Sequence, residues 1–383
     1  MKICIAQQNY HIGNFEQNAQ QMLSAIEEAK KEIEAIKLES LPTFENTVEA
    51  LEKSGKHLGI LSALFFNLNS AETNAELQGL AREISPLLTA HANDVLLDQE
   101  LFQRIAQVYE QKESLSLTAE QSTLLEKTYK SFVRNGAQLG AADAETLRRI
   151  DQELAQLSLQ FGEHVLAETN RFLHLVNQKS ELEGLPQGAL EAAAQLAEEK
   201  GHAGNWAFSL DYPSYIPVMT YAKNRGLRKT LFMAFNTKCA KGDELDNQDI
   251  LKQLVTLRHR RAQLLGYESH ANFTLEERMA KSPETVFEFL HSLLEKAKPK
   301  AKLDVEEVAV LAKKLDQLEA LEKWDFAYYS ELLKKEKYAF DEEELRPYFS
   351  LENVISGVFA TASRLFGLRF VPNSEIPVYH PEV

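Results

Sequence analysis

Cysteine is scarce in this chain, which has 383 residues and only two thiols, Cys4 and Cys239. Two thiols so far apart in sequence do not make the disulfide framework of a small secreted protein, so we expect a reducing, cytoplasmic location. The first residues, MKICIAQQNYHIGNF, contain one lysine, a short apolar run and no small-residue cleavage site. They do not predict a secretory signal.

Long apolar runs and an excess of positive charge are also lacking. The longest apolar runs, at 61–66 and 357–362, fall far short of the roughly 20 residues that a membrane-spanning helix needs. Lysine and arginine total 42 against 57 aspartates and glutamates, a net charge of -15, which repels a phosphate backbone. We therefore expect a soluble protein with neither a membrane nor a nucleic acid as its partner.

The chain is rich in helical periodicity. Hydrophobic residues make up 44% of it, enough for a substantial core. Between residues 18 and 37, Met22, Ile26, Ala29 and Ile33 recur at spacings of three and four, as in an amphipathic helix. No fixed-period repeat is visible. We predict a mainly α fold, an irregular multi-helix array with helices near 18–37, 42–66, 75–95, 98–112, 118–135, 143–177, 187–200 and, with interruptions, 225–365.

Short β segments are predicted at three places. The first eight residues are β-rich and precede a turn-like His-Ile-Gly-Asn, so we expect one short strand there. Minor β structure is expected near 205–220, where Trp206, Phe208 and Leu210 alternate with small or polar residues before two prolines. The third segment is near 368–380, where prolines again follow apolar residues.

Histidines do not form a metal-binding motif. Many zinc hydrolases place two histidines four apart on one helix with a glutamate beside the first. The two closest histidines here, His164 and His174, are ten positions apart, so no single helix supplies two to one metal. Glu163 and His164 are adjacent, but a histidine on an ordinary helix surface is the preferred interpretation. The ten histidines are His11, His57, His91, His164, His174, His202, His259, His270, His291 and His380.

Other candidate groups also have simpler interpretations. Cys239 is either a nucleophile or, as we prefer, a small buried hydrophobe. The basic cluster 258–261 is either an anion site or, preferably, a solvated helix face. Aromatic residues between 324 and 349 either line a peptide channel or, preferably, pack in the core. Four glycines lack the spacing of a phosphate-binding loop, namely Gly201, Gly204, Gly226 and Gly242. From these patterns alone we predict no catalytic, cofactor-binding or metal-ligating residue in this chain.

Eight ordered blocks of sequence resemble the thimet oligopeptidase family of zinc metallopeptidases, particularly its oligopeptidase A and dipeptidyl carboxypeptidase branch. Helical composition alone would not reproduce tryptophan, tyrosine, proline and asparagine at these places. The blocks are PTFENTVEALEKSG (42–55), FFNLNSAETNAELQGLAREISPLL (65–88), FVRNGAQL (132–139), LAQLSLQFGEHVLAETN (154–170), LDYPSYIPVMTYAKNRGLR (210–228), LGYESHANFTLEERMAKSP (265–283), WDFAYYSELLKKEKYAFDEEELRPYFSLENVISGVF (324–359) and LFGLRF (365–370).

The resemblance implies a zincin-like helical fold with a deep channel that admits short peptides. It also implies a zinc site, made by a His-Glu-x-x-His helix and a later glutamate, in the part of the protein that follows the stretch at 376–381. We therefore expect this chain to be the N-terminal part of such an enzyme, truncated before the zinc motif and inactive alone. Its expected partners are short peptides, the missing catalytic half and, through exposed apolar surface, other copies of itself.

The first residues depart from that family. Residues 1–30 resemble the start of the nitrilase-type domain of glutamine-dependent NAD synthetase. We thus predict a nitrilase-like segment at 1–30, joined by gene fusion, rearrangement or sequence assembly error, and an oligopeptidase region at 31–383. Two alternatives to a peptidase fragment remain open: a non-catalytic peptide-binding or scaffold protein, and a remnant of a glutamine amidohydrolase.

Overall fold

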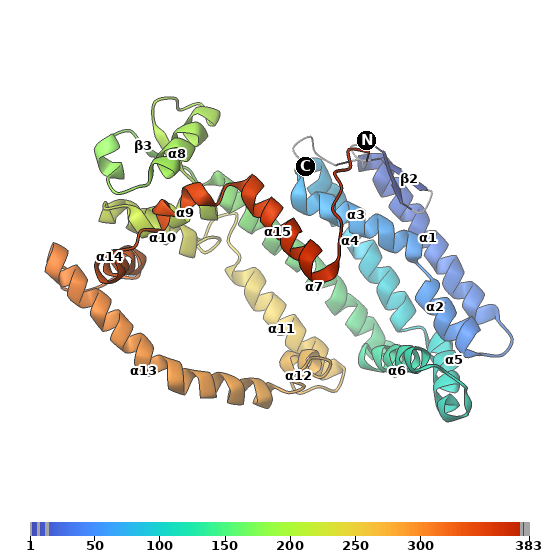
Figure 1. Cartoon of the computed structure of the whole chain (residues 1–383). Helices are drawn as coiled ribbons and strands as arrows, with labels where there is room; N and C mark the ends of the chain where they lie inside the picture. Colours follow the sequence, from blue (N-terminus) through green and yellow to red (C-terminus); the bar gives the residue numbers. More distant parts are fainter. Residues whose placement is uncertain (1, 6–7, 12–14, 376–377, 379–383) are drawn as a thin grey trace. The chain divides into compact units, whose positions relative to one another are not determined.

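The computed structural model describes residues 2–5, 8–11, 15–375 and 378, and α-helices dominate it (Figure 1). The mainly α fold predicted from the sequence is confirmed. The chain divides into two compact units. Unit 1 comprises Met1–Glu163, Asp249–Ser282 and Asn373–Val383, and unit 2 comprises His164–Gln248 and Pro283–Pro372. Among the described residues, no helix is long and apolar enough to cross a membrane.

Unit 1 is built around α1, α3 and α4, which pack against one another (Figure 1, blue). The predicted helical stripe is buried as expected, with Met22, Ile26, Ala29 and Ile33 each at most 6% exposed. Its helices are α1 (Phe15–Leu38), η1 (Phe44–Glu49), α2 (Ala50–Lys53), α3 (Lys56–Ala71), α4 (Ala75–Leu96), α5 (Gln99–Glu110), η2 (Lys112–Ser114), α6 (Ala119–Arg134), most of α7 (Ala141–Arg171), nearly all of α11 (Gln248–Leu264) and α12 (His270–Leu275).

The helix predicted over 42–66 is interrupted. It begins as expected, because Thr43 caps the backbone N–H of Asn46 and the Asn46 side chain accepts from the backbone N–H of Thr43. It stops at Ser54, and Gly55 adopts a left-handed φ of 65° before α3 begins. A glycine tolerates that conformation at little cost, so it breaks the continuous helix that the apolar spacing predicts.

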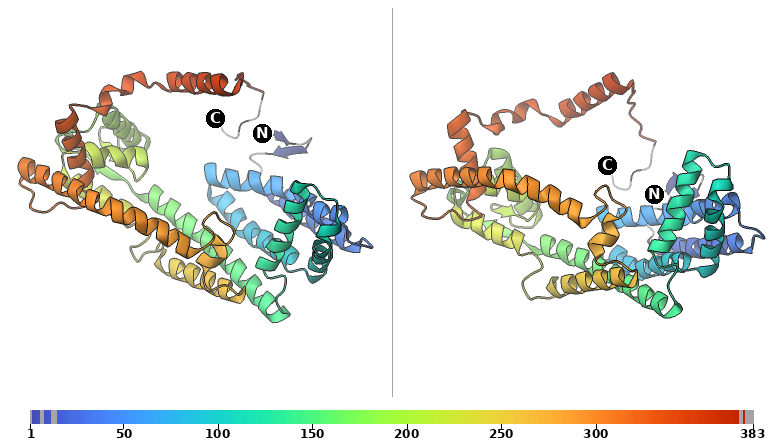
Figure 2. Two further views of the ribbon diagram at one scale, coloured as in Figure 1. Left: turned by 60° about the horizontal axis from the view of Figure 1, so that its bottom comes forward. Right: turned by 90° about the horizontal axis from the view of Figure 1, so that it is seen from below.

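Unit 2 contains a two-stranded sheet among its helices. β3 pairs antiparallel with β4, from His174 opposite Phe208 to Val176 opposite Trp206. Its elements are the end of α7, β3 (His174–Val176), η3 (Lys179–Leu182), α8 (Gln187–Glu199), β4 (Trp206–Phe208), α9 (Tyr212–Tyr221), α10 (Arg225–Asn236), α13 (Pro283–Asp316), α14 (Phe326–Tyr338), η4 (Glu342–Glu344), η5 (Arg346–Tyr348) and α15 (Leu351–Phe366). In Figure 2, α13 is a long rod, and α14 packs against it.

Two sequence predictions for unit 2 need correction. The helix predicted to continue to residue 177 ends at Arg171, because the following residues pair with β4 and bury Val176. The β structure predicted over 205–220 is found only at β4, and Tyr212–Tyr221 is a helix. Pro213 lies in the first turn of that helix, where a missing N–H costs nothing.

The ends of the chain also differ from the predictions. Instead of one strand, Lys2–Ile5 (β1) and Gln8–His11 (β2) form an antiparallel hairpin. α1 continues without a break across residues 30 and 31, and the predicted division there stays a prediction. Described residues 367–375 contain no strand, so the β structure expected over 368–380 is wrong in that stretch. Residues 376, 377, 379 and 380 lie outside the described part.

Candidate functional site

The histidines of the described part do not gather around a common point. In that part of the chain, no three histidine, cysteine, aspartate or glutamate side chains form a group that could hold a metal ion. His164 Nδ1 lies 3.0 Å from the side-chain oxygen of the buried Asn247, and Glu163 pairs instead with Arg82 at 2.9 Å. The adjacent Glu163 and His164 thus serve two different contacts and do not act together.

Cys239 is a buried thiol, as the preferred interpretation predicted. It is 4% exposed, and burial raises its pKa, helped by the nearby carboxylates of Glu168 and Asp243. A nucleophilic cysteine needs the opposite shift, toward the thiolate. Its surroundings are held by ion pairs, because Arg171 bonds both Glu168 and Asp243, and Lys241 bonds Glu168. This cluster fastens the loop before α11 to the end of α7.

The basic cluster 258–261 is divided by the fold. Arg258, His259 and Arg260 are exposed, in keeping with a solvated helix face. Arg261 turns inward and donates from Nε to Asp151 Oδ1 at 2.6 Å. One of the four basic residues is therefore already neutralised, and they form no joint anion site.

The aromatic residues between 324 and 349 differ in burial. Trp324, Tyr328 and Tyr329 pack against buried clusters of unit 2, as the preferred interpretation predicted. That interpretation is wrong for Phe326 and Tyr338, which are exposed, and also for Tyr348 and Phe349, whose side chains are exposed. Together with residues of α15, these two rings line an apolar groove of about 650 Å³.

A second concavity lies in unit 1 between charged residues of α1, α4 and α7. It has a volume of about 450 Å³ and includes His91, Asp98 and Arg148 in its lining. Its charges already have partners: Asp98 accepts from Lys37 at 2.8 Å, and Arg148 donates to Asp94. The carboxylate of Asp98 and the guanidinium of Arg148 are therefore occupied, whereas the buried His91 Nδ1 has no hydrogen-bond partner among the described residues.

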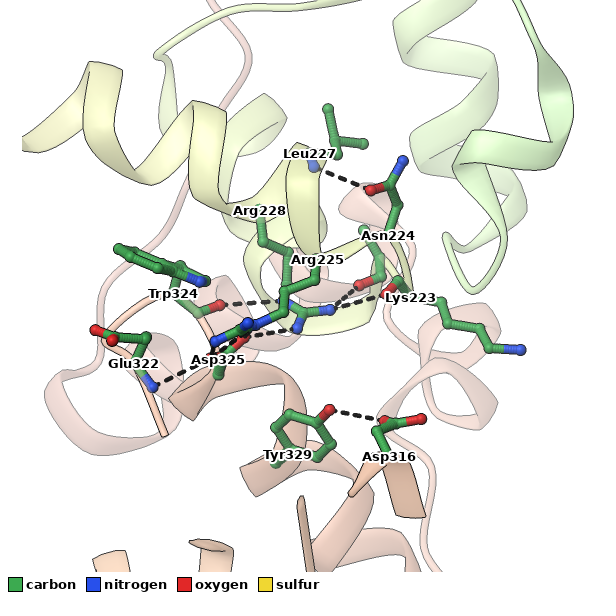
Figure 3. A network of polar contacts seen from close by, with 11 residues as sticks. Lys223, Asn224, Arg225, Leu227, Arg228, Asp316, Glu322, Trp324, Asp325 and Tyr329 are labelled. Atoms are coloured by element: carbon green, nitrogen blue, oxygen red, sulfur yellow. Dashed lines mark hydrogen bonds and ion pairs between the residues drawn. The ribbon is translucent and has the colours of Figure 1, made fainter. Parts of the chain in front are cut away.

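A network of polar contacts in unit 2 surrounds Asp325, in the loop before α14 (Figure 3). Its carboxylate is fully buried and accepts from Arg225 Nε at 2.9 Å, from Arg228 Nη2 at 2.9 Å and from the backbone N–H of Glu322 at 3.1 Å. Burial opposes the charge, but the hydrogen bonds from Arg225 and Arg228 outweigh it and hold the pKa of Asp325 below its usual value. The carboxylate is therefore ionised and has its partners in place.

Arg228 is the centre of the same network. Only 1% of it is exposed, and its Nη1 and Nε donate to the backbone carbonyl oxygens of Ala222 and Trp324 at 2.7 and 3.1 Å. Its guanidinium also lies 4.3 Å from the ring centre of Tyr328. Figure 3 shows these donors converging from α10 on the loop before α14. We call this set the Asp325 clasp; it joins segments about 100 residues apart, and its saturated groups have no capacity left for acid–base chemistry.

Residues 218–383, which include the clasp, match the sequence model of peptidase family M3. The whole chain has curated relatives. Dipeptidyl carboxypeptidase of Escherichia coli is 36% identical over 360 residues, which are 94% of this chain and 53% of that protein. Probable cytosolic oligopeptidase A of Arabidopsis thaliana is 34% identical, over 95% of this chain and 52% of that protein. Oligopeptidase A of Salmonella typhimurium is 30% identical, over 94% and 53%.

The chain is thus related to the M3 peptidases, and the resemblance to the thimet oligopeptidase family is confirmed. It spans about half the length of the curated relatives that it matches. The likeness of residues 1–30 to NAD synthetase gains no support from these relatives and stays a prediction.

Proposed function

We propose that this chain is the N-terminal portion of a cytoplasmic, zinc-dependent oligopeptidase that hydrolyses short peptides within a channel. The observation that carries the proposal is the similarity of 94% of the chain to about half of a dipeptidyl carboxypeptidase. Relatives named oligopeptidase A match over the same share, which supports a peptide substrate without deciding between the two modes of cleavage.

Zinc would be held outside this chain. The sequence contains no His-Glu-x-x-His motif, and the described residues contain no group of three metal-binding side chains. Zinc bound in a peptidase polarises the scissile carbonyl and activates water. The residues present here do not fit that role, so we propose that they form part of the channel wall and support the catalytic part.

A complementation experiment tests the proposal. The probe is the part of Escherichia coli dipeptidyl carboxypeptidase that this chain does not match, loaded with zinc. We expect each polypeptide alone to be inactive toward a quenched fluorescent short peptide, and the mixture to cleave it in a chelator-sensitive manner. A mixture that binds the peptide without cleaving it would favour the alternative, a non-catalytic peptide-binding protein.

A further inference from the structure

α15 is a well-specified helix with little cover, although Phe370 stacks on its Phe359 with ring centres 4.3 Å apart. Ser350 caps it by accepting from the backbone N–H of Asn353, and Gly367 ends it with a left-handed φ of 65°. Yet residues 351–361 are all exposed. In both views of Figure 2, α15 (red) extends away from the other helices of unit 2.

The exposed surface of α15 is strongly apolar. Leu351 is 69% exposed, Val358 58% and Phe366 74%. The groove of about 650 Å³ runs along this helix between its apolar residues and the rings of Tyr348 and Phe349. Contiguous apolar surface of this kind marks a contact site in a soluble protein.

The sequence of α15 would not hold a helix in water by itself. Isolated helices shorter than about 12–15 residues are marginal in water even when rich in alanine, and α15, with 16 residues, barely exceeds that length. Val354, Ile355 and Val358 are β-branched, and Gly357 in its interior costs about 1 kcal/mol relative to alanine. In proteins, packing of the apolar face against another surface supplies most of the stability of a helix of this composition.

The chemistry of α15 indicates an apolar polypeptide as its cover. Glu352 and Arg364 are its only charged residues, whereas 26% of the whole chain is charged. Around Gly357 there is room for close approach, because no heavy atom beyond its chain neighbours and the backbone of the helix itself lies within 4 Å of where a Cβ would stand. A charged or strongly hydrated partner would gain little from this surface.

A second exposed apolar stripe, on α13, indicates that the partner is large. On α13, Val308 and Leu311 are buried, and α13 packs against α14. The same helical face continues toward the N-terminus through Leu290, Leu293 and Leu294, each about half exposed. Obligate interfaces bury about 2,000–5,000 Å² and are rich in apolar residues. One short peptide would not cover both α13 and α15.

We propose that α15 is a docking helix, enclosed in the working protein by the polypeptide that corresponds to the half of the relatives that this chain does not span. This rests on the proposed function and on relatives of nearly twice the matched length. A second copy of this chain has the same two apolar surfaces and could cover α15 instead. The experiment must therefore distinguish self-association from binding of the other polypeptide.

Hydrogen exchange of the full chain provides the first test. The backbone amides of α15 should exchange quickly in the isolated chain and become protected when the unmatched part of Escherichia coli dipeptidyl carboxypeptidase is added. Protection in the isolated monomer as strong as in α7, or no complex at micromolar concentrations, would overturn the proposal. Protection that arises from dimers of the chain itself would assign the surface to a second copy and also overturn it.

A pair of matched valine variants makes the test specific. Val358→Asp places a charge in the α15 surface, whereas Val310→Asp makes the same change at an exposed valine (69%) off the α13 stripe. We expect Val358→Asp to weaken the complex at least about tenfold and Val310→Asp to change it by less than about threefold. Equal effects of the two variants would contradict a docking role for α15.

The two proposals fail in different ways. A complex that protects α15 and is weakened by Val358→Asp, but never cleaves peptide, would refute the peptidase function and leave the docking helix intact. A complex that cleaves peptide with α15 still unprotected would refute the docking helix alone.

Discussion

Replacing Asp325 with asparagine should destabilise unit 2 strongly. Asparagine has nearly the shape of aspartate but no charge, so Asp325→Asn leaves the guanidinium of Arg228 buried, at 1% exposure, without its counter-ion. Removing one partner of a buried ion pair costs about 3–5 kcal/mol. Arg225, whose side chain is 44% exposed, can regain water, which argues for the lower end of that range.

The natural fluorophores make this measurement local. The chain has two tryptophans, Trp206 and Trp324, and both pack against the same buried cluster of unit 2. Urea unfolding followed by tryptophan fluorescence therefore reports on unit 2. We expect its free energy of unfolding to fall by about 3 kcal/mol in Asp325→Asn.

Two further variants control the experiment. Glu319→Gln breaks an ion pair of unit 2 with Lys313, in which the glutamate side chain is 84% exposed, and should cost less than about 0.5 kcal/mol. Adding Arg228→Met to Asp325→Asn removes the orphaned charge and should recover part of the loss. If Asp325→Asn unfolded within about 1 kcal/mol of the natural chain, the clasp would not stabilise the unit as argued.

Three more predictions follow from single residues. Because the folded-state pKa of Asp325 is lowered, its stabilisation is fully present above its unfolded pKa of about 4 and is lost as the pH falls toward the folded pKa, so the gap in unfolding free energy between the natural chain and Asp325→Asn should narrow as the pH is lowered below about 4; a constant gap would contradict this. Gly184→Ala should lower the free energy of unfolding by about 2 kcal/mol more than Gly201→Ala. Both glycines have a positive φ, but only a Cβ at Gly184 would collide with the backbone oxygen of Tyr221. Equal losses in the two variants would refute this prediction. In a Cys4→Ser variant, Cys239 should react with a thiol reagent only after urea unfolding, because it is buried with a raised pKa; rapid labelling of this folded variant would show that Cys239 is accessible.

Helices with a strong apolar stripe could be predicted from the sequence because their burial follows local spacing. α1 is the clearest case, and its predicted core residues are buried. Tertiary pairing decides the elements that were missed. The local sequence of His174–Val176 does not distinguish a strand from a continuation of α7. Its pairing with Trp206–Phe208 makes it a strand.

The Asp325 clasp could not be found from the sequence. Asp325 stands inside the conspicuous aromatic run that begins at Trp324, and the run drew attention to its rings. Its partners Arg225 and Arg228 are about 100 residues away, and no periodic pattern connects charges over such a distance. The exposure of α15 was likewise hidden, because an amphipathic pattern predicts a helix without saying what covers it.

Zinc content and peptide cleavage of the purified chain alone test the central claim most directly. The chain is measured with and without added zinc, using a quenched short peptide and a chelator control. The account predicts no stoichiometric zinc and no chelator-sensitive cleavage, because the proposed function assigns the metal and its chemistry to a polypeptide corresponding to the part of the relatives that this chain does not span. Stoichiometric zinc together with chelator-sensitive cleavage would show that this chain assembles a metal site of its own, and would contradict the account.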